Sequence, residues 1–237
     1  MTTEFKSQDD LPAKWDLEYR AKGIPSSIST EPSGSLEDAV TRLERSGLRG
    51  GLAVDIGCGT GRNSLYLADR GYTVVSMDFV PRMVSSLQDL IRGTEREKRI
   101  FPFCQSVSAA WPMAERSRDL AVDMFCFKHL VTDKDRSAYI SELERALAPS
   151  GHFLLTLAGQ DDGYYGPLPR VPGDFPGKTI VDPENSIPSA LYEKDDIESM
   201  FSKFLFTEHY EKKVKTGWMH GSNYVRTTHV FLMRRID

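Results

Sequence analysis

The sequence is poor in cysteine, contains no long apolar run and carries no large excess of charge. Its three cysteines, Cys58, Cys104 and Cys126, are odd in number and lack the spacing of metal ligands, which excludes a disulfide scaffold and argues against zinc. The 30 basic and 34 acidic residues give a formal charge of -4, so no positive field would draw the chain to nucleic acid or an anionic membrane. We therefore expect no bound metal and neither of these partners.

An apolar leader is also missing, and no stretch approaches the roughly 18 apolar residues of a membrane helix. This pattern predicts a soluble, cytoplasmic protein. The 237 residues, 40% hydrophobic and 27% charged, are enough for one folded α/β domain with additions and exclude a disordered or collagen-like chain.

From about residue 50 onwards, short apolar runs alternate with helical patterns. The patterns predict strands and helices in this order: strand 52–57, helix 63–70, strand 72–78, helix 81–93, strands 99–107 and 119–127, helix 136–148 and strand 151–158. Repeated strands and helices indicate a parallel sheet covered on both faces. A helix at 193–203 and a hairpin of strands at 205–215 and 227–235 are expected to close the chain.

Two segments fall outside this alternation. Residues 1–48 contain a short helix around Trp15 and Tyr19, a turn-rich loop, and a helix at 35–46. Residues 159–192 are rich in glycine and proline, and loops of this length in compact domains are usually functional or disordered.

The most informative segment is the glycine cluster that follows the first strand. A phosphate-binding P-loop needs Lys and Ser or Thr after its last glycine, but Arg62 and Asn63 stand there. A dinucleotide-binding turn needs a small residue at the position of Arg62, so a nicotinamide-dependent oxidoreductase is disfavoured. The remaining interpretation combines Asp55 before the turn with Asp78, which ends the next strand and whose carboxylate suits a ribose diol.

Four ordered landmarks make the chain similar to a known family. DIGCGTG at 55–61, Asp78 with Phe79, WPMAERSRDLAVD at 111–123 and LAPSGHFLL at 147–155 resemble the class I S-adenosylmethionine-dependent methyltransferases. The resemblance covers roughly residues 50–158 and implies an α/β, Rossmann-like, seven-stranded sheet, mostly parallel with an antiparallel last strand and helices on both faces. It also implies S-adenosylmethionine as cofactor and S-adenosylhomocysteine as product.

The resemblance implies a set of cofactor-binding residues. Many members have an Asp about where Ser106 stands, so the contact with adenine falls here to Ser106 and Val107. Asp123, at the end of the fourth strand, would support the cofactor or orient the substrate. The full cofactor set is Asp55, Gly57, Cys58, Gly59, Gly61, Asp78, Phe79, Ser106, Val107 and Asp123.

Candidates for the chemistry follow the fourth strand, since open parallel sheets bind ligands at the carboxyl ends of their strands. His129 is a candidate base, with structural capping of the loop as the alternative. Asp123 is the second catalytic candidate, or else a cap or an ion-pair partner. Substrate contacts are expected from two aromatic residues in the N-terminal segment, one lysine and three loop tyrosines, all of which are otherwise packing or surface residues: Trp15, Tyr19, Lys128, Tyr164, Tyr165 and Tyr192.

We therefore predict a single domain, 1–237, built from an N-terminal lid (1–48), a cofactor-binding core (49–158), a substrate loop (159–192) and a closing helix and hairpin (193–237). The predicted function is methyl transfer to a small-molecule acceptor by a monomer or homodimer. A protein that binds the cofactor as a sensor or partner without transferring methyl is the alternative.

Overall fold

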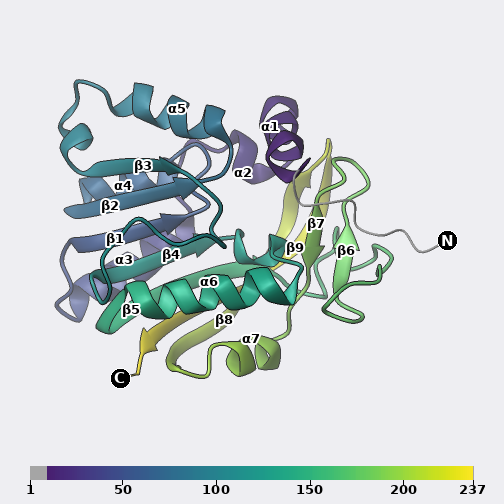
Figure 1. Ribbon diagram of the computed structural model, residues 1–237. Helices are drawn as coiled ribbons and strands as arrows, with labels where there is room; N and C mark the ends of the chain where they lie inside the picture. Colours follow the sequence, from purple (N-terminus) through teal and green to yellow (C-terminus); the bar gives the residue numbers. More distant parts are fainter. Residues whose placement is uncertain (1–9, 237) are drawn as a thin grey trace.

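The structure, a computed structural model, describes residues 10–236 and is built on one seven-stranded sheet (Figure 1). The strand order is β3-β2-β1-β4-β5-β9-β8. The strands are β1 (Gly51–Ile56), β2 (Tyr72–Asp78), β3 (Ile100–Cys104), β4 (Arg118–Met124), β5 (Leu147–Ala158), β8 (Phe204–Met219) and β9 (Ser222–Arg235). Strands β1 to β5 pair in parallel, and β9 is antiparallel to both β5 and β8, which confirms the predicted fold class.

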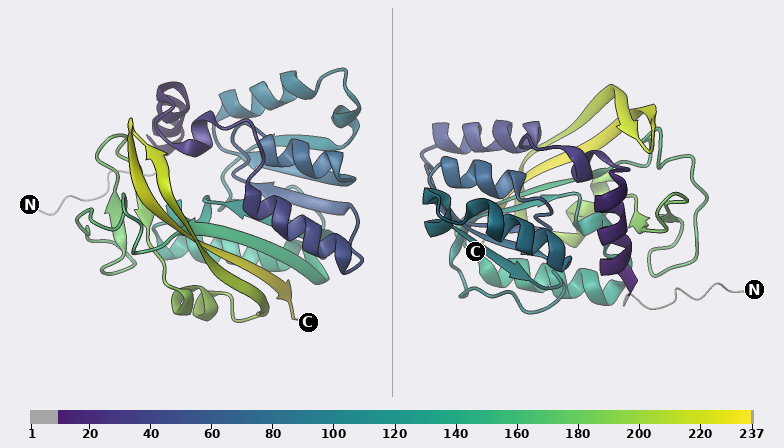
Figure 2. Two further views of the ribbon diagram at one scale, coloured as in Figure 1. Left: turned by 180° about the vertical axis from the view of Figure 1, so that it is seen from behind. Right: turned by 90° about the horizontal axis from the view of Figure 1, so that it is seen from above.

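Helices cover both faces of the sheet (Figures 1 and 2). One face carries α3 (Gly34–Arg45), α4 (Arg62–Asp69) and α5 (Pro81–Ile91). The other carries α6 (Asp133–Ala146) and α7 (Lys194–Met200). Helix α3 illustrates why the helices pack on the sheet: its apolar side chains at 36, 39, 40 and 43 share one face and are all buried.

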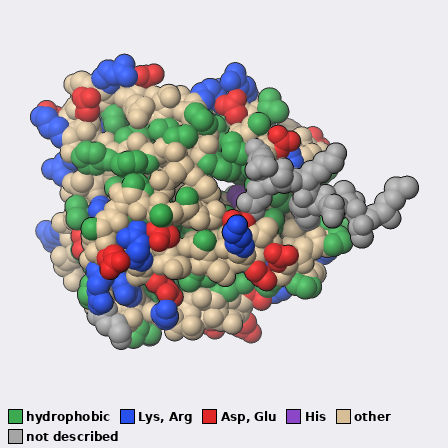
Figure 3. All heavy atoms as spheres, in the orientation of Figure 1, with side chains coloured by type: hydrophobic (Ala, Val, Ile, Leu, Met, Phe, Trp, Pro, Cys, Tyr) green, Lys and Arg blue, Asp and Glu red, His purple; other side chains and the backbone are tan. Residues whose placement is uncertain are grey.

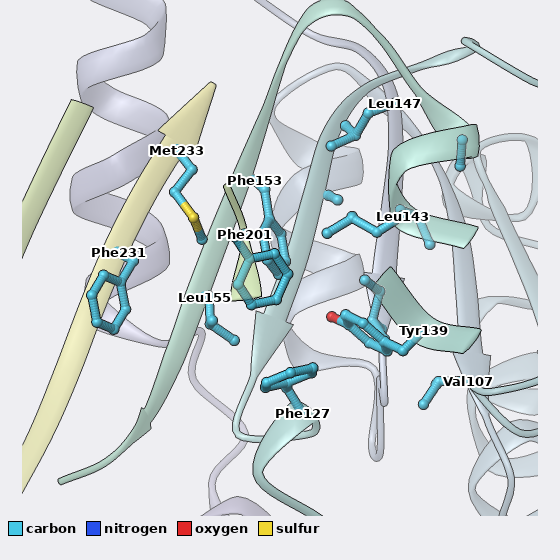
Figure 4. Close-up of a cluster of buried hydrophobic side chains, with 14 of the residues drawn as sticks. Val107, Phe127, Tyr139, Leu143, Leu147, Phe153, Leu155, Phe201, Phe231 and Met233 are labelled. Carbon is cyan, nitrogen blue, oxygen red and sulfur yellow. The ribbon is translucent and has the colours of Figure 1, made fainter. Parts of the chain in front are cut away.

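The largest apolar cluster lies between the sheet and the α6–α7 layer (Figure 4). Phe201, which follows α7, packs its ring 5.3 Å from Phe127 and 5.5 Å from Phe153, measured between ring centroids. Tyr139 of α6 lies 5.1 Å from Phe127 in the same way. These rings fix the segment after β4 against the sheet, close to the edge where the parallel strands end.

Two regions differ from the sequence-based expectation. The closing hairpin was expected to turn over several residues around 217–223, but β8 and β9 continue to a tight turn at His220 and Gly221. Register shifts at Phe206/Glu208 and Val214/Gly217 bend β8. The loop at 159–192 also has structure of its own: β6 (Thr179–Val181) and β7 (Pro188–Ala190) form a small second sheet.

The remaining elements are short. Helix α1 (Leu11–Ala21) and helix α2 (Pro25–Ile28) precede α3, and the 3-10 turns η2 (Glu95–Lys98) and η3 (Phe127–His129) precede β3 and α6. Predicted boundaries were displaced where strands end early at Cys104 and Met124, and β5 begins at Leu147, which the helical pattern had included.

Helix α1 lies outside the sheet, near the tip of the β8–β9 hairpin (Figure 2). Asp16 binds Arg82 of α5 at 2.5 Å, and Asn185 of the 159–192 loop donates to Glu18 at 3.0 Å. The backbone carbonyl of Gly23 accepts a hydrogen bond from the amide of His220 at 2.7 Å. The N-terminal segment is thus joined to three separate parts of the molecule. Within residues 10–236, no helix is long and apolar enough to cross a membrane.

A first prediction concerns the aromatic cluster. Phe201→Ala should lower the free energy of unfolding by roughly 3–5 kcal/mol, because the deleted ring is fully buried against three other rings. Urea denaturation measures the change. Phe101→Ala is the matched control: Phe101 is 45% exposed on edge strand β3, where Figure 3 shows apolar side chains at the surface, and its loss should cost less than about 1 kcal/mol. Equal losses in the two variants would contradict this account of the core.

Candidate functional site

The turn that follows β1 is shaped by glycines. Gly57 and Gly61 have φ of 70° and 80°, in the region that favours glycine. A Cβ at Gly57 would lie 2.7 Å from Cβ of Cys126, and one at Gly61 would lie 2.4 Å from a methyl carbon of Leu87. The turn therefore needs glycine both for its backbone angles and for close approach of the segment after β4 and of α5.

Asp78 connects this turn to the end of β2. Its carboxylate accepts a hydrogen bond from the amide of Gly59 at 2.8 Å and another from the amide of Val80 at 2.9 Å. Burial raises the pKa of Asp78 to about 6, against the lowering effect of these amides. A carboxylate has about four lone-pair sites, so acceptor capacity remains for a ligand.

Asp55 occupies the layer below the turn. It is buried in β1 and accepts a hydrogen bond from the Ser64 hydroxyl at 2.6 Å, and Ser76 in turn donates to Ser64 at 2.8 Å. Burial raises the pKa of Asp55 to about 6. Asp55 thus holds the first turn of α4 from beneath.

A cavity of about 820 Å³ opens where β1 to β4 end. Figure 3 shows a hollow near the middle of one face, with a histidine side chain at its edge. Its walls come from α1 and α2, the strand ends, the segment after β4, and the β8–β9 hairpin. Lining side chains from the expected set are Trp15, Tyr19, Gly57, Asp78, Phe79, Ser106, Val107, Lys128, His129 and Tyr165. The other expected residues do not line the cavity: Asp55, Cys58, Gly59, Gly61, Asp123, Tyr164 and Tyr192.

Phe79 and residues 105–108 form the part of the cavity beside Asp78. The hydroxyls of Ser106 and Ser108 lie 2.9 Å apart. The indole of Trp111 donates to the carbonyl of Val107 at 2.8 Å, which holds this loop in place. Ser106 and Val107, the residues expected to contact adenine, therefore lie at the cavity wall.

Asp123 is fully buried and does not line the cavity. Its carboxylate accepts hydrogen bonds from the amides of Cys126 (2.7 Å) and Phe127 (2.9 Å) and from the hydroxyl of Tyr139 (2.8 Å). Phe125, which lies between Asp123 and Cys126 in the chain, has φ of 75°. This conformation costs a non-glycine residue energy, and the hydrogen bonds to Asp123 stabilise it. Asp123 thus holds the backbone turn on which the cavity residues stand, and its expected catalytic and cofactor-binding role stays a prediction.

His129 stands at the end of that turn. Its Nδ1 lies 2.9 Å from the carbonyl oxygen of Pro188 and 3.1 Å from the hydroxyl of Ser189, and Trp15 packs edge-on against its ring at 4.9 Å. Because a carbonyl oxygen only accepts, Nδ1 carries the proton and Nε2 keeps its lone pair. Burial, together with the charge of Lys128, holds the pKa of His129 well below its usual range, so the ring is neutral.

Of the three loop tyrosines, only Tyr165 lines the cavity. Tyr164 donates to Asp182 at 2.8 Å and packs behind Tyr165, with 5.1 Å between the ring centroids. Tyr192 is fully buried between Phe127 and Phe175. In this structure Tyr164 and Tyr192 pack against neighbouring side chains and do not line the cavity, so their expected substrate contacts stay a prediction.

Tyr19 lies over the glycine turn. A Cβ at Gly59 would be 2.6 Å from the Tyr19 hydroxyl, so α1 reaches the turn directly. Trp15 and Tyr19 pack against each other at 5.7 Å, as their spacing of four residues predicts.

Several lining residues lay outside the expected set. Arg62 lines the cavity, and its guanidinium donates to the carbonyl of Glu31 at 2.8 Å. Its position after the glycine turn predicted no ligand contact. Arg226, Trp218 and Met219 reach it from the hairpin. The sequence around Arg226 shows no motif that indicates a ligand contact. Arg226 reaches the cavity because the β8–β9 hairpin is long enough to extend to it.

Residues 53–151 match the family model of the methyltransferase domain. This segment is a methyltransferase domain, in agreement with the resemblance to the class I S-adenosylmethionine-dependent methyltransferases. Its cofactor is S-adenosylmethionine. The match spans β1 to the start of β5 and includes the glycine turn, Asp78 and the segment after β4.

Solved structures are similar over nearly the whole methyltransferase chain. The 1,6-didemethyltoxoflavin-N1-methyltransferase of Burkholderia thailandensis, solved with 1,6-didemethyltoxoflavin and S-adenosylhomocysteine, has a TM-score of 0.69 at 17% identity and covers 100% of this chain and 94% of its own. A methyltransferase of Methanosarcina mazei gives 0.67 at 19%, covering 82% and 97%. A structure described for the conversion of a disulfide bond into a thioacetal group during echinomycin biosynthesis gives 0.66 at 21%, covering 95% and 92%. At these identities the likeness supports the fold alone.

A second prediction concerns pH and Asp123. Burial raises the pKa of Asp123 in the folded protein to about 7. In the unfolded chain the pKa of Asp is about 3.9. Between about pH 4 and 7 the folded protein therefore keeps a proton on Asp123 that the unfolded chain has released. The free energy of unfolding contributed by this group therefore falls as the pH rises through that window. Asp123→Asn cannot ionise, and we expect its stability to fall less steeply over this range in urea denaturation. The exposed Asp89→Asn should keep the wild-type slope. A wild-type slope in Asp123→Asn would exclude the raised pKa.

Proposed function

We propose that this methyltransferase transfers the methyl group of S-adenosylmethionine to a small-molecule acceptor bound in the cavity. The observation that carries the proposal is the cavity itself, whose volume of about 820 Å³ lies within the roughly 300–1,000 Å³ of small-ligand sites. It is walled by α1 on one side and the hairpin on another, a shape suited to enclosing a small molecule. The solved relative that methylates 1,6-didemethyltoxoflavin is consistent with this class of acceptor.

The cofactor would be held at the end of the cavity formed by β1, β2 and β3. Asp78 keeps acceptor capacity for ribose hydroxyls, the bare backbone at Gly57 permits close approach, and Phe79 offers an apolar face beside them. Ser106 and Val107 are the proposed neighbours of adenine. These residues fit the group that the family requires.

The acceptor would lie between that end and the apolar wall formed by Trp15, Trp218 and Met219. When bound, S-adenosylmethionine supplies a methyl group activated by its sulfonium, so the protein's main tasks are to align the acceptor and exclude water. Helix α1 performs the exclusion, since Asp16 and Glu18 bind it to α5 and to the 159–192 loop.

His129 is the proposed base for an acceptor that must lose a proton. Its Nδ1 proton is committed to the carbonyl of Pro188, so Nε2 is the atom available to accept. Trp15 packs against the ring and limits its rotation. Lys128 supplies a nearby positive charge that disfavours an imidazolium, so the ring would return the proton readily.

A third prediction tests the cofactor end. Asp78→Ala should weaken S-adenosylmethionine binding by roughly 1–3 kcal/mol, because charge-assisted hydrogen bonds to the ligand are lost. Isothermal titration of the folded variant measures this, with the exposed Asp89→Ala as a control that keeps wild-type affinity. Unchanged affinity in folded Asp78→Ala would remove Asp78 from the site.

A fourth prediction tests His129. His129→Asn can still donate to Pro188 but has no basic nitrogen, so the turnover number should fall by roughly 10²–10⁴-fold while cofactor affinity stays unchanged. Release of S-adenosylhomocysteine is followed on a panel of small hydroxyl, thiol and heteroaromatic N–H compounds. His152→Asn, on β5 away from the cavity, is the matched control. Wild-type turnover by His129→Asn at every pH would rule out its role as base.

A further inference from the structure

Lys128 carries a buried amine without a hydrogen-bond partner. The residue is 2% exposed, lines the cavity, and makes no hydrogen bond through Nζ to any residue from 10 to 236. Nζ lies 3.7 Å from the centroid of the Tyr165 ring. A ring face attracts a cation but does not replace hydrogen-bond acceptors for three N–H donors.

The two carboxylates nearby are already engaged. Asp162 accepts from Nε of Arg226 at 2.7 Å and from the backbone amides of residues 164, 165 and 227. Asp182 accepts from the Tyr164 hydroxyl and the amide of Glu184, and faces Nε2 of His220 at 3.1 Å. Their charges favour the ammonium form of Lys128 without binding it. Burial and the charge of Arg226 act in the opposite direction and lower the pKa of Lys128 to about 7.

Arg226 brings a second cation to the same wall of the cavity. Its guanidinium carbon lies 5.2 Å from the centroid of the Tyr165 ring, and within the described chain its terminal nitrogens make no hydrogen bond. Gly217 on β8 makes room for it, since a Cβ there would lie 2.2 Å from Cγ of Arg226. Lys128, Arg226 and Tyr165 thus form a group with one permanent and one titratable positive charge, one aromatic ring and, within residues 10–236, no acceptor for the free N–H donors.

We propose that Lys128 and Arg226 bind an oxyanion carried by the methyl acceptor, either a carboxylate or an acidic enol or imide. The inference rests on the proposed function and adds the substrate class: an apolar or aromatic acid. An anion would supply the hydrogen-bond acceptors that the amine lacks, and the apolar wall of Trp15, Trp218 and Met219 suits the apolar or aromatic body of such an acid. The carboxylate of the cofactor has the same chemistry, so the test separates the two sources.

The test compares acids with their neutral counterparts on the protein loaded with S-adenosylhomocysteine. The probes are 4-hydroxybenzoate against 4-hydroxybenzamide, and indole-3-carboxylate against indole-3-carboxamide, in isothermal titration near neutral pH. At least one acid should bind about 10- to 100-fold more tightly than its amide. Since part of the Lys128 amine is unprotonated at this pH, acid binding should take up a proton, which repeating the titration in buffers of different ionisation enthalpy detects.

Lys128→Met removes the amine and keeps the length of the side chain. It should reduce the affinity for the acid to that for the amide and leave the affinities for the amide and for S-adenosylhomocysteine unchanged. It should also raise Tm by about 2–4 °C, because an unpartnered buried amine is replaced by an apolar group. Lys203→Met, on the surface beside Glu144, is the matched control and should change neither affinity.

Three outcomes would overturn the proposal. They are equal binding of every acid and its amide by the wild-type protein, unchanged acid binding in Lys128→Met, and a loss of S-adenosylhomocysteine affinity in that variant, which would assign the amine to the cofactor. The first and third need not touch the proposed function, since methyl transfer to a neutral compound of the panel would preserve it. The acid–amide comparison and the proton uptake need no variant, so a folding failure of Lys128→Met leaves the test intact.

Discussion

The carboxylate of Asp78, held by the amides of Gly59 and Val80, is the interaction on which the site depends. The parallel pairing of β1 and β2 brings their ends side by side, with Ile56 opposite Met77. Asp78 then closes the gap between the turn after β1 and the start of α5. Its burial raises its pKa to about 6, so the two amides offset only part of the desolvation. A ligand that donated hydrogen bonds to this carboxylate would reduce the remainder, which makes the same residue a structural tie and a binding group.

The glycine turn after β1 and the position of Asp78 were predictable because short-range constraints determine them. The turn needs glycines with positive φ at 57 and 61, and Asp78 ends the next strand. This short pattern can be recognised in the sequence without knowledge of the residues that pack around it. The sheet was predictable for a related reason, since buried parallel strands are short apolar runs between helices. The boundaries were not, because hydrogen-bond registers rather than composition end β3 at Cys104 and begin β5 at Leu147.

The acceptor end depends on long-range packing, and there the sequence was a weaker guide. Asp123 lies at the end of β4, as the pattern implied, but the left-handed backbone of Phe125 turns the chain so that the amides of Cys126 and Phe127 donate to the carboxylate. Tyr164 and Tyr165 are neighbours in sequence, yet one binds Asp182 and the other lines the cavity. Only the three-dimensional path of the 159–192 loop separates these outcomes. Arg226 depends on it too, because Asp162 of that loop orients its guanidinium.

The charges of the cavity are sorted along its length. Asp78 and Arg62, of opposite charge, line the end formed by β1, β2 and β3, whereas the two cations Lys128 and Arg226 stand where the segment after β4 meets the hairpin. In a partly desolvated cavity such charges act over longer distances than in water, because the effective dielectric is lower. A cationic sulfonium would therefore favour the first end, and an anion the second. His129 follows Lys128 directly, and burial together with the charge of Lys128 holds the pKa of His129 well below its usual range, so the candidate base belongs electrostatically to the proposed acceptor end. The proposed division of labour between the two ends thus follows from where the sheet and the hairpin place these four charged side chains.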